Sequence, residues 1–509
     1  MTWEEYGASV VARARAKKRP MESIVLGKSR QLLVDNWLIA HCENLNRTLH
    51  QPVKDTRNPL IRPESPWEQS ISWSSVIWDE EEAVFKAWYQ NYQADRLLYA
   101  VSQDGISWEK PSLGVVECDG GKDNNIVFST RGMDSPSVIK DVHDPDPGRR
   151  YKLLAQWADP VYGLYVGFSE DGKAWRIGET PVLTPANDPA INDRPTVMQD
   201  HVGRRFIAIT KREIANPFGR GDWGFYHRSR AISVSRDFET WTDPVLTLHP
   251  DDSDPPDLQI YGLVGFNYES TYLGLMDMYW SRESGPKERI IDVQLALSRD
   301  GEVWWRAGNR NTFLPVGPDN AWDRYLVAPT NSQPTLMGDE IWIYYRGQGA
   351  HRHRKGIAEH RRKDPWHVPG HPRDSALEPG TPTSGIGLAR LRRDGFVSLD
   401  AGTKPGLLLT RPLHFEGKEL HLNADAASGS VRAELYRAVE VPFKYPGQNW
   451  TIGKPIPGYA LTDCLPIREN TTDSVLCWKN RKTLADLAKY PLVIRFELVQ
   501  SALYAFWFV

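Results

Sequence analysis

The sequence is poor in cysteine and has no long hydrophobic run. Its 509 residues include four cysteines, Cys42, Cys118, Cys464 and Cys477, whose spacing fits no metal-binding motif. We expect reduced structural thiols, although a Cys464–Cys477 pair stays open. No apolar stretch reaches the length of a membrane span, and none follows the basic residues 14–19. A cytoplasmic location without a secretory signal is therefore expected.

A strong excess of charge of either sign is also missing. The chain carries 62 Lys and Arg against 65 Asp and Glu, for a net charge of −3. This balance gives no reason to expect nucleic acid or an anionic membrane as a partner. We expect no cofactor and no bound metal ion, and the oligomeric state stays open.

Aromatic residues and turn formers, in contrast, are plentiful. There are 20 Trp, 20 Tyr and 15 Phe, together with 39 Gly and 37 Pro, a composition typical of a turn-rich β protein. A motif S-x-D-G-x-x-W recurs at 102–108, 169–175, 235–241 and 298–304, with Phe238 replacing Gly in the third copy. In such a turn Asp accepts bonds from nearby amides, Gly takes positive φ and Ser ties the loop.

The motif recurs at intervals of 67, 66 and 63 residues, which indicates a repeat architecture. Residues 393–396, Arg-Asp-Gly-Phe, form a degenerate fifth copy. Each repeat also holds two apolar runs separated by a polar turn, as four-stranded propeller blades do. We expect an all-β protein with a helical arm over residues 1–30, a five-bladed β-propeller over 31–400 and a C-terminal β-sandwich over 401–509.

An acidic residue precedes the expected first strand of every repeat. First strands of propeller blades begin around one end of the central channel, so their preceding residues converge. Carboxylates gathered there are the groups that cleavage of a glycosidic bond needs. For any single acid, the preference of Asp and Glu for turns is an equally good explanation. Asp134 and Asp193 stand out because both lie in the same D-x-P-[ST]-V setting. The five acids are Glu68, Asp134, Asp193, Asp257 and Asp323.

The repeat series resembles the five-bladed propeller glycoside hydrolases of the family 32, 43 and 130 type, and especially uncharacterised family-32-like proteins. The resemblance covers about 370 residues, and the C-terminal region is similar to the sandwich that follows the family 32 propeller. It implies three catalytic acids from the first three blades. Asp134 then corresponds to the transition-state stabiliser, Asp193 to the general acid, and Glu68 is the nearest match to the nucleophile. The family 32 motif N-D-P-N-G is absent from the first blade.

Ten residues, Asp323 among them again, are candidates for binding the substrate. Aromatic side chains at strand ends can stack on sugar rings, although propeller blades also pack on aromatic residues. Charged residues at such strand ends are expected to face water or a ligand. The set is Trp73, Trp157, Arg194, Lys211, Arg212, Tyr261, Tyr279, Asp323, Arg346 and His351.

Residues 347–373 contain five of the 13 histidines and seven Lys or Arg side chains. This segment is a solvated basic loop, a lid that attracts an anionic sugar or, with weaker support from its spacing, a metal site. Over the whole chain, the favoured function is a glycoside hydrolase, or a phosphorylase, that uses paired acids on a small glycan. The alternatives are a non-catalytic propeller that binds carbohydrate or protein, and a sialidase-like hydrolase.

Overall fold

The structure, a computed structural model, describes residues 23–91, 95–130, 132–191, 193–216, 226–280, 290–349, 381–440, 450–479 and 483–509. Within these ranges regular structure consists of β-strands and short 3-10 turns, at Pro147–Arg149, Gly308–Arg310 and Ala485–Leu487. The all-β class predicted from the sequence is confirmed. No described helix is long and apolar enough to cross a membrane.

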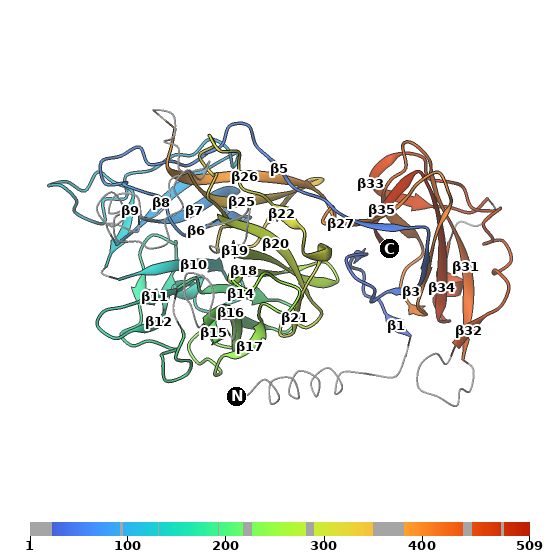
Figure 1. Cartoon of the computed structure of the whole chain (residues 1–509), viewed down its shortest axis with the longest axis horizontal. Coiled ribbons are helices and arrows are strands. Elements are labelled where there is room, and N and C mark those ends of the chain that lie inside the picture. Colours follow the sequence, from blue (N-terminus) through green and yellow to red (C-terminus); the bar gives the residue numbers. More distant parts are fainter. Residues whose placement is uncertain are drawn as a thin grey trace. The chain divides into compact units, whose positions relative to one another are not determined.

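The chain divides into two compact units, which are described separately (Figure 1). The repeat unit comprises His50–Arg393, and the terminal unit joins the described residues before 50 to Asp394–Val509. The repeat unit thus starts later and ends earlier than the predicted propeller range 31–400, because strand β2 (Gln31–Leu32) pairs with β35 (Ser501–Phe508) in the terminal unit. Residues 1–22 of the predicted helical arm lie outside the described residues. Within its remainder, β1 (Ile24–Val25) is a strand that pairs with β29 (Leu413–His414).

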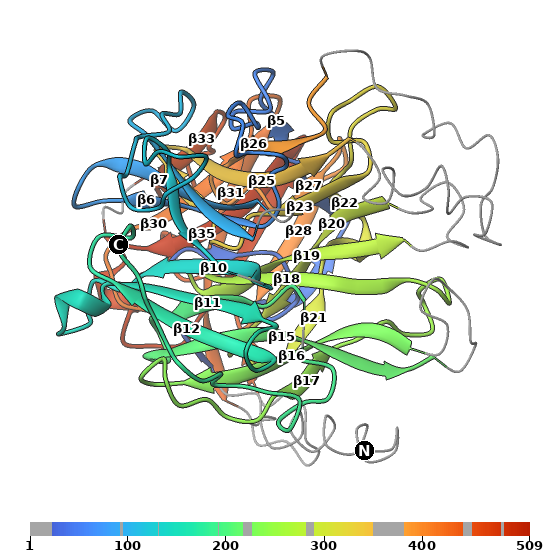
Figure 2. The same ribbon diagram turned by 90° about the vertical axis from the view of Figure 1, so that its left-hand side faces the viewer.

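The repeat unit consists of antiparallel sheets that follow one another along the chain; several can be traced in Figure 2. The first three have four strands each. They are β6 (Ser74–Asp79), β7 (Val84–Asn91), β8 (Arg96–Ser102) and β9 (Ile126–Ser129); β10 (Asp134–Lys140), β11 (Tyr151–Trp157), β12 (Gly163–Ser169) and β13 (Arg176–Ile177); and β14 (Thr196–Asp200), β15 (Arg205–Ala215), β16 (Tyr226–Ser235) and β17 (Val245–Leu248).

Two further strand sets are joined into one sheet by a single parallel pair, Ile291 with Leu326. The fourth set is β18 (Gln259–Tyr268), β19 (Thr271–Trp280) and β20 (Ile290–Ser298), with β21 (Trp304–Arg306) and β22 (Thr312–Leu314) on β20. The fifth is β23 (Leu326–Pro329), β24 (Thr335–Met337), β25 (Glu340–Gln348), β26 (Ser384–Arg392) and β5 (Val53–Lys54).

Side-chain hydroxyls connect the first strands of neighbouring sheets. Each hydroxyl bonds a backbone group of another first strand, so a polar side chain replaces the missing ladder between sheets. The bonds are Val76 N to Ser332 Oγ (2.9 Å), Val138 N to Ser75 Oγ (2.9 Å), Val197 N to Ser137 Oγ (3.1 Å) and Thr196 Oγ1 to the carbonyl of Leu263 (2.6 Å). These bonds also align the first strands residue by residue.

The four S-x-D-G-x-x-W turns share one hydrogen-bond pattern. In each, the amide at the Gly position donates to the Ser Oγ at 2.8–2.9 Å. The Asp Oδ1 accepts from the next two amides, as predicted from the motif. The degenerate copy differs, because Asp394 bonds Arg30 and Asn423, each at 2.8 Å, inside the terminal unit. Asp394 is therefore no fifth member of the series.

Phe238 fills the glycine position of the third turn at a positive φ of 68°. The side chain is fully buried and meets Phe206 edge to face, with ring centroids 5.1 Å apart. At the equivalent Gly172, a Cβ would lie 2.4 Å from Trp88 Cζ2, so no side chain fits there. The third turn thus has a less favourable backbone conformation but buries an additional aromatic side chain in the core.

Replacement of Phe238 with Gly tests which of the two effects is larger. Loss of a buried Phe side chain costs about 3–5 kcal/mol. Relief of left-handed backbone returns only about 1–2 kcal/mol. We expect Phe238→Gly to lower the free energy of unfolding by about 2 kcal/mol, measured by urea titration. A variant as stable as the wild type would show that backbone strain dominates.

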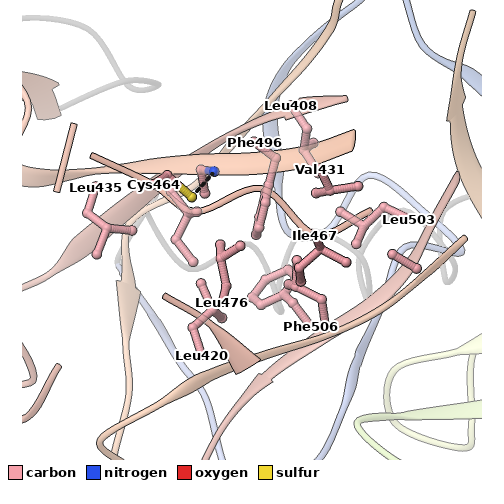
Figure 3. Close-up of a cluster of buried hydrophobic side chains, with 14 of the residues drawn as sticks. Leu408, Leu420, Val431, Leu435, Cys464, Ile467, Leu476, Phe496, Leu503 and Phe506 are labelled. Carbon is pink, nitrogen blue, oxygen red and sulfur yellow. Dashed lines mark hydrogen bonds between the residues drawn. The ribbon is translucent and has the colours of Figure 1, made fainter. Parts of the chain in front are cut away.

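The terminal unit contains two sheets that share one hydrophobic core. The first is β1, β29, β34 (Leu492–Val499), β28 (Gly406–Thr410) and β3 (Ile39–Glu43), with β31 (Ser430–Glu440) and β32 (Trp450–Ile452). The second is β33 (Asn470–Leu476), β30 (Leu420–Asp425), β35, β27 (Val397–Ala401) and β4 (Asn46–Leu49), with β2. Figure 3 shows Leu408 and Phe496 of the first sheet in the same cluster as Leu420 and Phe506 of the second.

Cys464 belongs to this core and carries no disulfide, like the other three cysteines. Its Sγ accepts a hydrogen bond from the amide of Ala433 at 3.3 Å, the dashed line in Figure 3. Burial raises the pKa of the Cys464 thiol to about 11. The side chain is thus a neutral, structural thiol at physiological pH.

Candidate functional site

In each sheet, the strand register places the start of the first strand beside the end of the second strand. Asp134 pairs with Gln156 at the end of β11, and Gln259 pairs with Tyr279 at the end of β19. We call this end of the repeat unit the site edge. The residues that precede β14, and those that end β15 and β25, belong to the same edge.

Asp134 and Asp193 occupy matched positions at the site edge. Each lies four residues before a valine whose amide donates to the hydroxyl of the previous sheet. The next residue has positive φ in both cases, 53° at Ser135 and 67° at Arg194, and proline follows. Such backbone costs about 1–3 kcal/mol at a non-glycine residue. A bond from Arg194 N to Ser135 Oγ, 3.0 Å long, connects the two turns.

Glu68 does not occupy the matching position in the first sheet. Four residues before Val76 lies Ser72, so the positional equivalence assumed for Glu68 is wrong. The Glu68 carboxylate is 5% exposed and is engaged on both oxygens. It accepts from the amides of Glu64 and Ser65, from Tyr89 Oη at 2.6 Å and from Lys110 Nζ at 2.7 Å. These contacts anchor the loop before β6.

Asp193 lies in a cationic and aromatic environment. Tyr261 Oη donates to its Oδ2 at 3.2 Å, and Lys211 Nζ is 4.0 Å from its Oδ1. Burial alone would raise the pKa of Asp193, but Arg228, Lys211 and Arg230 together hold that pKa below its usual value. The carboxylate therefore stays ionised at neutral pH. The resemblance implied a general acid at Asp193, whereas a lowered pKa favours the ionised form that a base or nucleophile uses.

Arg194 and Asp277 form a fully buried ion pair behind Asp193. Arg194 Nε is 2.7 Å from Asp277 Oδ2, and Arg194 Nη2 donates to the carbonyl of Pro329 at 3.0 Å. Gly262 leaves room for this pair, since a Cβ there would lie 2.2 Å from Asp277 Oδ2. Burial raises the pKa of Asp277. Arg194, predicted to bind substrate, is instead placed to fix the turn that carries Asp193.

Aromatic rings lie against the guanidinium groups that are near Asp193 or Asp277. The guanidinium carbons of Arg194 and Arg346 lie 4.2 and 4.5 Å from the ring centroid of Trp73. The Arg228 guanidinium lies 4.9 Å from the Tyr261 ring, whose centroid is 6.4 Å from that of Tyr279. We call Asp193, Arg194, Lys211, Arg228, Arg230, Asp277 and Arg346, with Trp73, Tyr261 and Tyr279, the central cluster.

Three predicted binding residues lie elsewhere. Arg212 follows Lys211 on β15 and pairs with Asp188 at 3.0 Å, because successive strand residues point to opposite faces. Trp157 is 4% exposed and packs on Tyr165 within the second sheet. Asp323 Oδ2 lies 2.6 Å from Lys54 Nζ in the fifth strand set.

His351 and most of the basic segment 347–373 lie outside the described residues, which end at Gly349 and resume at 381. The expected lid and the expected metal site in that segment therefore stay predictions. Within the ranges that the structure covers, no group of three His, Cys, Asp or Glu residues is arranged to hold a metal ion.

Sequence reasoning missed three members of the central cluster, Arg228, Arg230 and Asp277. Two patterns could have indicated them. Arg228 and Arg230 alternate along β16, which places both on one face of the strand. Asp277 is the one acidic residue in the apolar strand Thr271–Trp280 and is fully buried there.

No family model and no curated protein matches the chain. Similar solved structures include glycoside hydrolases of families 32, 43 and 130. A family 32 β-fructofuranosidase from Bombyx mori is 12% identical, with 90% of this chain and 95% of that chain covered and a TM-score of 0.42. A family 130 structure from work on enzymes acting on β-1,2-mannosidic linkages in Candida mannan is 14% identical, with coverages of 71% and 96% and a TM-score of 0.43.

An N-acetylgalactosamine deacetylase from F. plautii is also similar, at 14% identity, with 69% of this chain and 96% of that chain covered and a TM-score of 0.42. Because identities and TM-scores are this low, the function proposed next rests on the geometry of the site edge alone.

Proposed function

We propose that the chain is a glycoside hydrolase in which Asp193 and Asp134 are the paired catalytic carboxyl groups. One observation carries this proposal. Asp134 and Asp193 have matched positions before neighbouring first strands, each fixed by a residue of positive φ and a proline. Strained backbone that repeats at two acidic positions is typical of a functional site.

We further propose that the five strand sets of the repeat unit are the blades of a five-bladed propeller, and that the two sheets of the terminal unit are a β-sandwich. Support comes from the hydroxyl bonds that join successive first strands. The four equivalent turns after β8, β12, β16 and β20 agree with this arrangement.

We propose different roles for the two acids. Asp193 is held ionised by neighbouring cations, so it serves as base or nucleophile. Asp134 lies at the neighbouring position, is 9% exposed and accepts a 3.3 Å bond from Ser135 Oγ. In this proposal Asp134 is the group that protonates the leaving oxygen, because cleavage of a glycosidic bond needs one carboxyl group as acid beside a base or nucleophile.

Turnover of a glycoside panel tests this function. The panel contains 4-nitrophenyl α- and β-pyranosides and furanosides and a methylumbelliferyl sialoside, each with and without inorganic phosphate. Release of the aryl group without phosphate, lost in Asp134→Asn, is the expected result. Release that requires phosphate would instead indicate a phosphorylase, and cleavage of the sialoside alone a sialidase-like enzyme. Binding without any turnover would leave a non-catalytic carbohydrate-binding propeller.

A further inference from the structure

The turns that carry the two proposed carboxyl groups need support from outside themselves. Ser135 and Arg194 both have positive φ, at 53° and 67°, and both are fully buried. Backbone of this kind at a non-glycine residue persists only where the surrounding structure fixes it. Two buried side-chain amides, those of Gln90 and Asn331, make contacts that do so. Neither residue was among the candidates predicted from the sequence.

Gln90 bonds the backbone on both sides of Asp134. The residue lies near the end of β7 and is fully buried. Its Nε2 donates to the carbonyl of Met133 at 2.6 Å, and its Oε1 accepts from the amide of Ser135 at 3.3 Å. A carboxamide can do both because it carries a donor and an acceptor on one rigid group. The Gln90 backbone amide in turn donates to the carbonyl of Trp73 at 2.9 Å. The first sheet therefore holds the Asp134 turn of the second sheet.

Asn331 joins the two turns to each other and to the first sheet. It follows β23 in the fifth strand set and is fully buried. Its Oδ1 accepts from Arg194 Nη1, and its Nδ2 donates to the carbonyl of Pro136 at 2.8 Å. Its backbone amide donates to the carbonyl of Ser74 at 2.5 Å, and its carbonyl accepts from Ser137 Oγ at 2.9 Å. Since Pro136 belongs to one turn and Arg194 to the other, a single side-chain amide bonds both.

We propose that Gln90 and Asn331 are positioning residues, which fix the separation of the Asp134 and Asp193 carboxyl groups for cleavage of the glycosidic bond. The inference rests on the proposed function for its chemistry. In that reaction the separation of the two carboxyl groups determines whether a water molecule fits between them and the sugar. Misplacement of a reacting group by about 1 Å can cost about 10²-fold in rate. Amides locked in a buried core supply the required precision.

Substitutions of the two amides test the positioning role. Gln90→Met keeps the length of the side chain and removes both bonds. We expect a kcat about 10–100-fold lower with KM changed less than about threefold, because the reacting groups move while the substrate contacts stay. Asn331→Ala is expected to behave in the same way. Asn331→Asp keeps an acceptor for Arg194 and should retain more of the kcat than Asn331→Ala. Rates are measured on folded protein with the aryl glycoside identified in the panel.

Asn124 provides a matched control in the same unit. It is a buried amide in the loop before β9, the outer strand of the first sheet. Its Nδ2 donates to the carbonyl of Val116 at 2.8 Å, and its Oδ1 accepts from the amide of Ile126 at 3.0 Å. Asn124→Ala should lower stability and leave kcat unchanged. Wild-type kcat in folded Gln90→Met, or an equal loss of kcat in Asn124→Ala, would overturn the positioning role.

Amide hydrogen exchange reports on the same bonds without any substrate. The Ser135 amide donates to Gln90 Oε1, and the Arg194 amide donates to Ser135 Oγ at 3.0 Å. We expect the exchange of these two amides to be about tenfold or more faster in Gln90→Met, because the local opening that exposes them becomes easier. The Asn124→Ala variant should exchange both at the wild-type rate. Unchanged exchange in Gln90→Met overturns the positioning role, whether or not the wild type hydrolyses a glycoside.

The two proposals fail in different ways. Hydrolysis by the wild type, with kcat and exchange both unchanged in Gln90→Met, would leave the hydrolase and remove the positioning role. Faster exchange in Gln90→Met, in a protein that hydrolyses no glycoside, would leave the two amides as residues that fix the turns and remove the hydrolase.

Discussion

Asp193→Asn is expected to lower kcat/KM by about 10²–10⁴-fold, the range that a positioned acid or base contributes. Asparagine keeps the shape of the side chain and can still accept from Tyr261 Oη, which bonds Asp193 at 3.2 Å. It removes the negative charge that would accept a proton or attack the anomeric carbon. Rates on an aryl glycoside substrate identified in the panel, with kcat and KM determined separately, give the measurement.

The same change is also expected to reduce stability, so a folded control is needed. The Asp193 carboxylate interacts favourably with Lys211, Arg228 and Arg230 in the fold. Its lowered pKa means that the ionised form stabilises the native state at neutral pH. Asp188→Asn provides the comparison, because Asp188 is an almost fully buried carboxylate of the same loop that pairs with Arg212. Asp188→Asn should lower stability while kcat is retained.

Chemical rescue separates catalysis from packing. In Asp193→Ala, added formate or azide is expected to restore part of the lost rate, because a small anion can take the place of the missing carboxylate. A merely structural carboxylate would show no rescue. Wild-type kcat in Asp193→Asn, measured on protein shown to be folded, would remove Asp193 from the mechanism.

Features determined by local chemistry could be predicted from the sequence. The apolar runs expected in each repeat form strands, for example Tyr151–Trp157 and Thr271–Trp280. The Ser and Asp bonds of the four turns also follow from residues only two or three positions apart. The equivalence of Asp134 and Asp193 was visible because both are embedded in the same five-residue pattern.

Features determined by contacts between sheets could not be predicted in this way. In the first sheet, Ser72 rather than Glu68 occupies the position that matches Asp134 and Asp193. This alignment depends on a bond from Val76 to Ser332, which are 256 residues apart. The Arg194–Asp277 pair joins residues 83 apart, and each looks ordinary in its own segment. The ionised state of Asp193 depends on Arg228 and Arg230, which reach it from a different strand. The protonation state of Asp193 is therefore a tertiary property.

Asp79→Ala is expected to destabilise the repeat unit by about 3–5 kcal/mol, the cost of removing one partner of a buried ion pair. Asp79 is fully buried at the end of β6, where Lys86 Nζ lies 2.9 Å and Lys140 Nζ 2.5 Å from its oxygens and Tyr151 Oη donates to it. Among the described residues, the substitution would leave Lys86, 2% exposed, with the exposed Glu82 as its one carboxylate partner. Glu82→Gln should cost less than about 1 kcal/mol, as exposed pairs do.

The pH dependence gives this prediction a second readout. Burial would raise the pKa of Asp79, but Lys140, Tyr151 and Lys86 outweigh it and hold that pKa far below its usual value. A carboxyl whose folded pKa is depressed contributes its full stability above the unfolded pKa of about 3.9 and loses it as pH falls further. The difference in free energy of unfolding between wild type and Asp79→Ala, measured by urea titration, should therefore be constant from pH 5 to 8 and shrink below about pH 4.

Activity provides the control. Strand β6 begins at the site edge and ends at Asp79, roughly 17 Å away at 3.3 Å per residue. The kcat of the folded variant should therefore be unchanged. A difference below 1 kcal/mol at pH 7, or one that persists unchanged at pH 3, would show that the buried lysines are satisfied without Asp79.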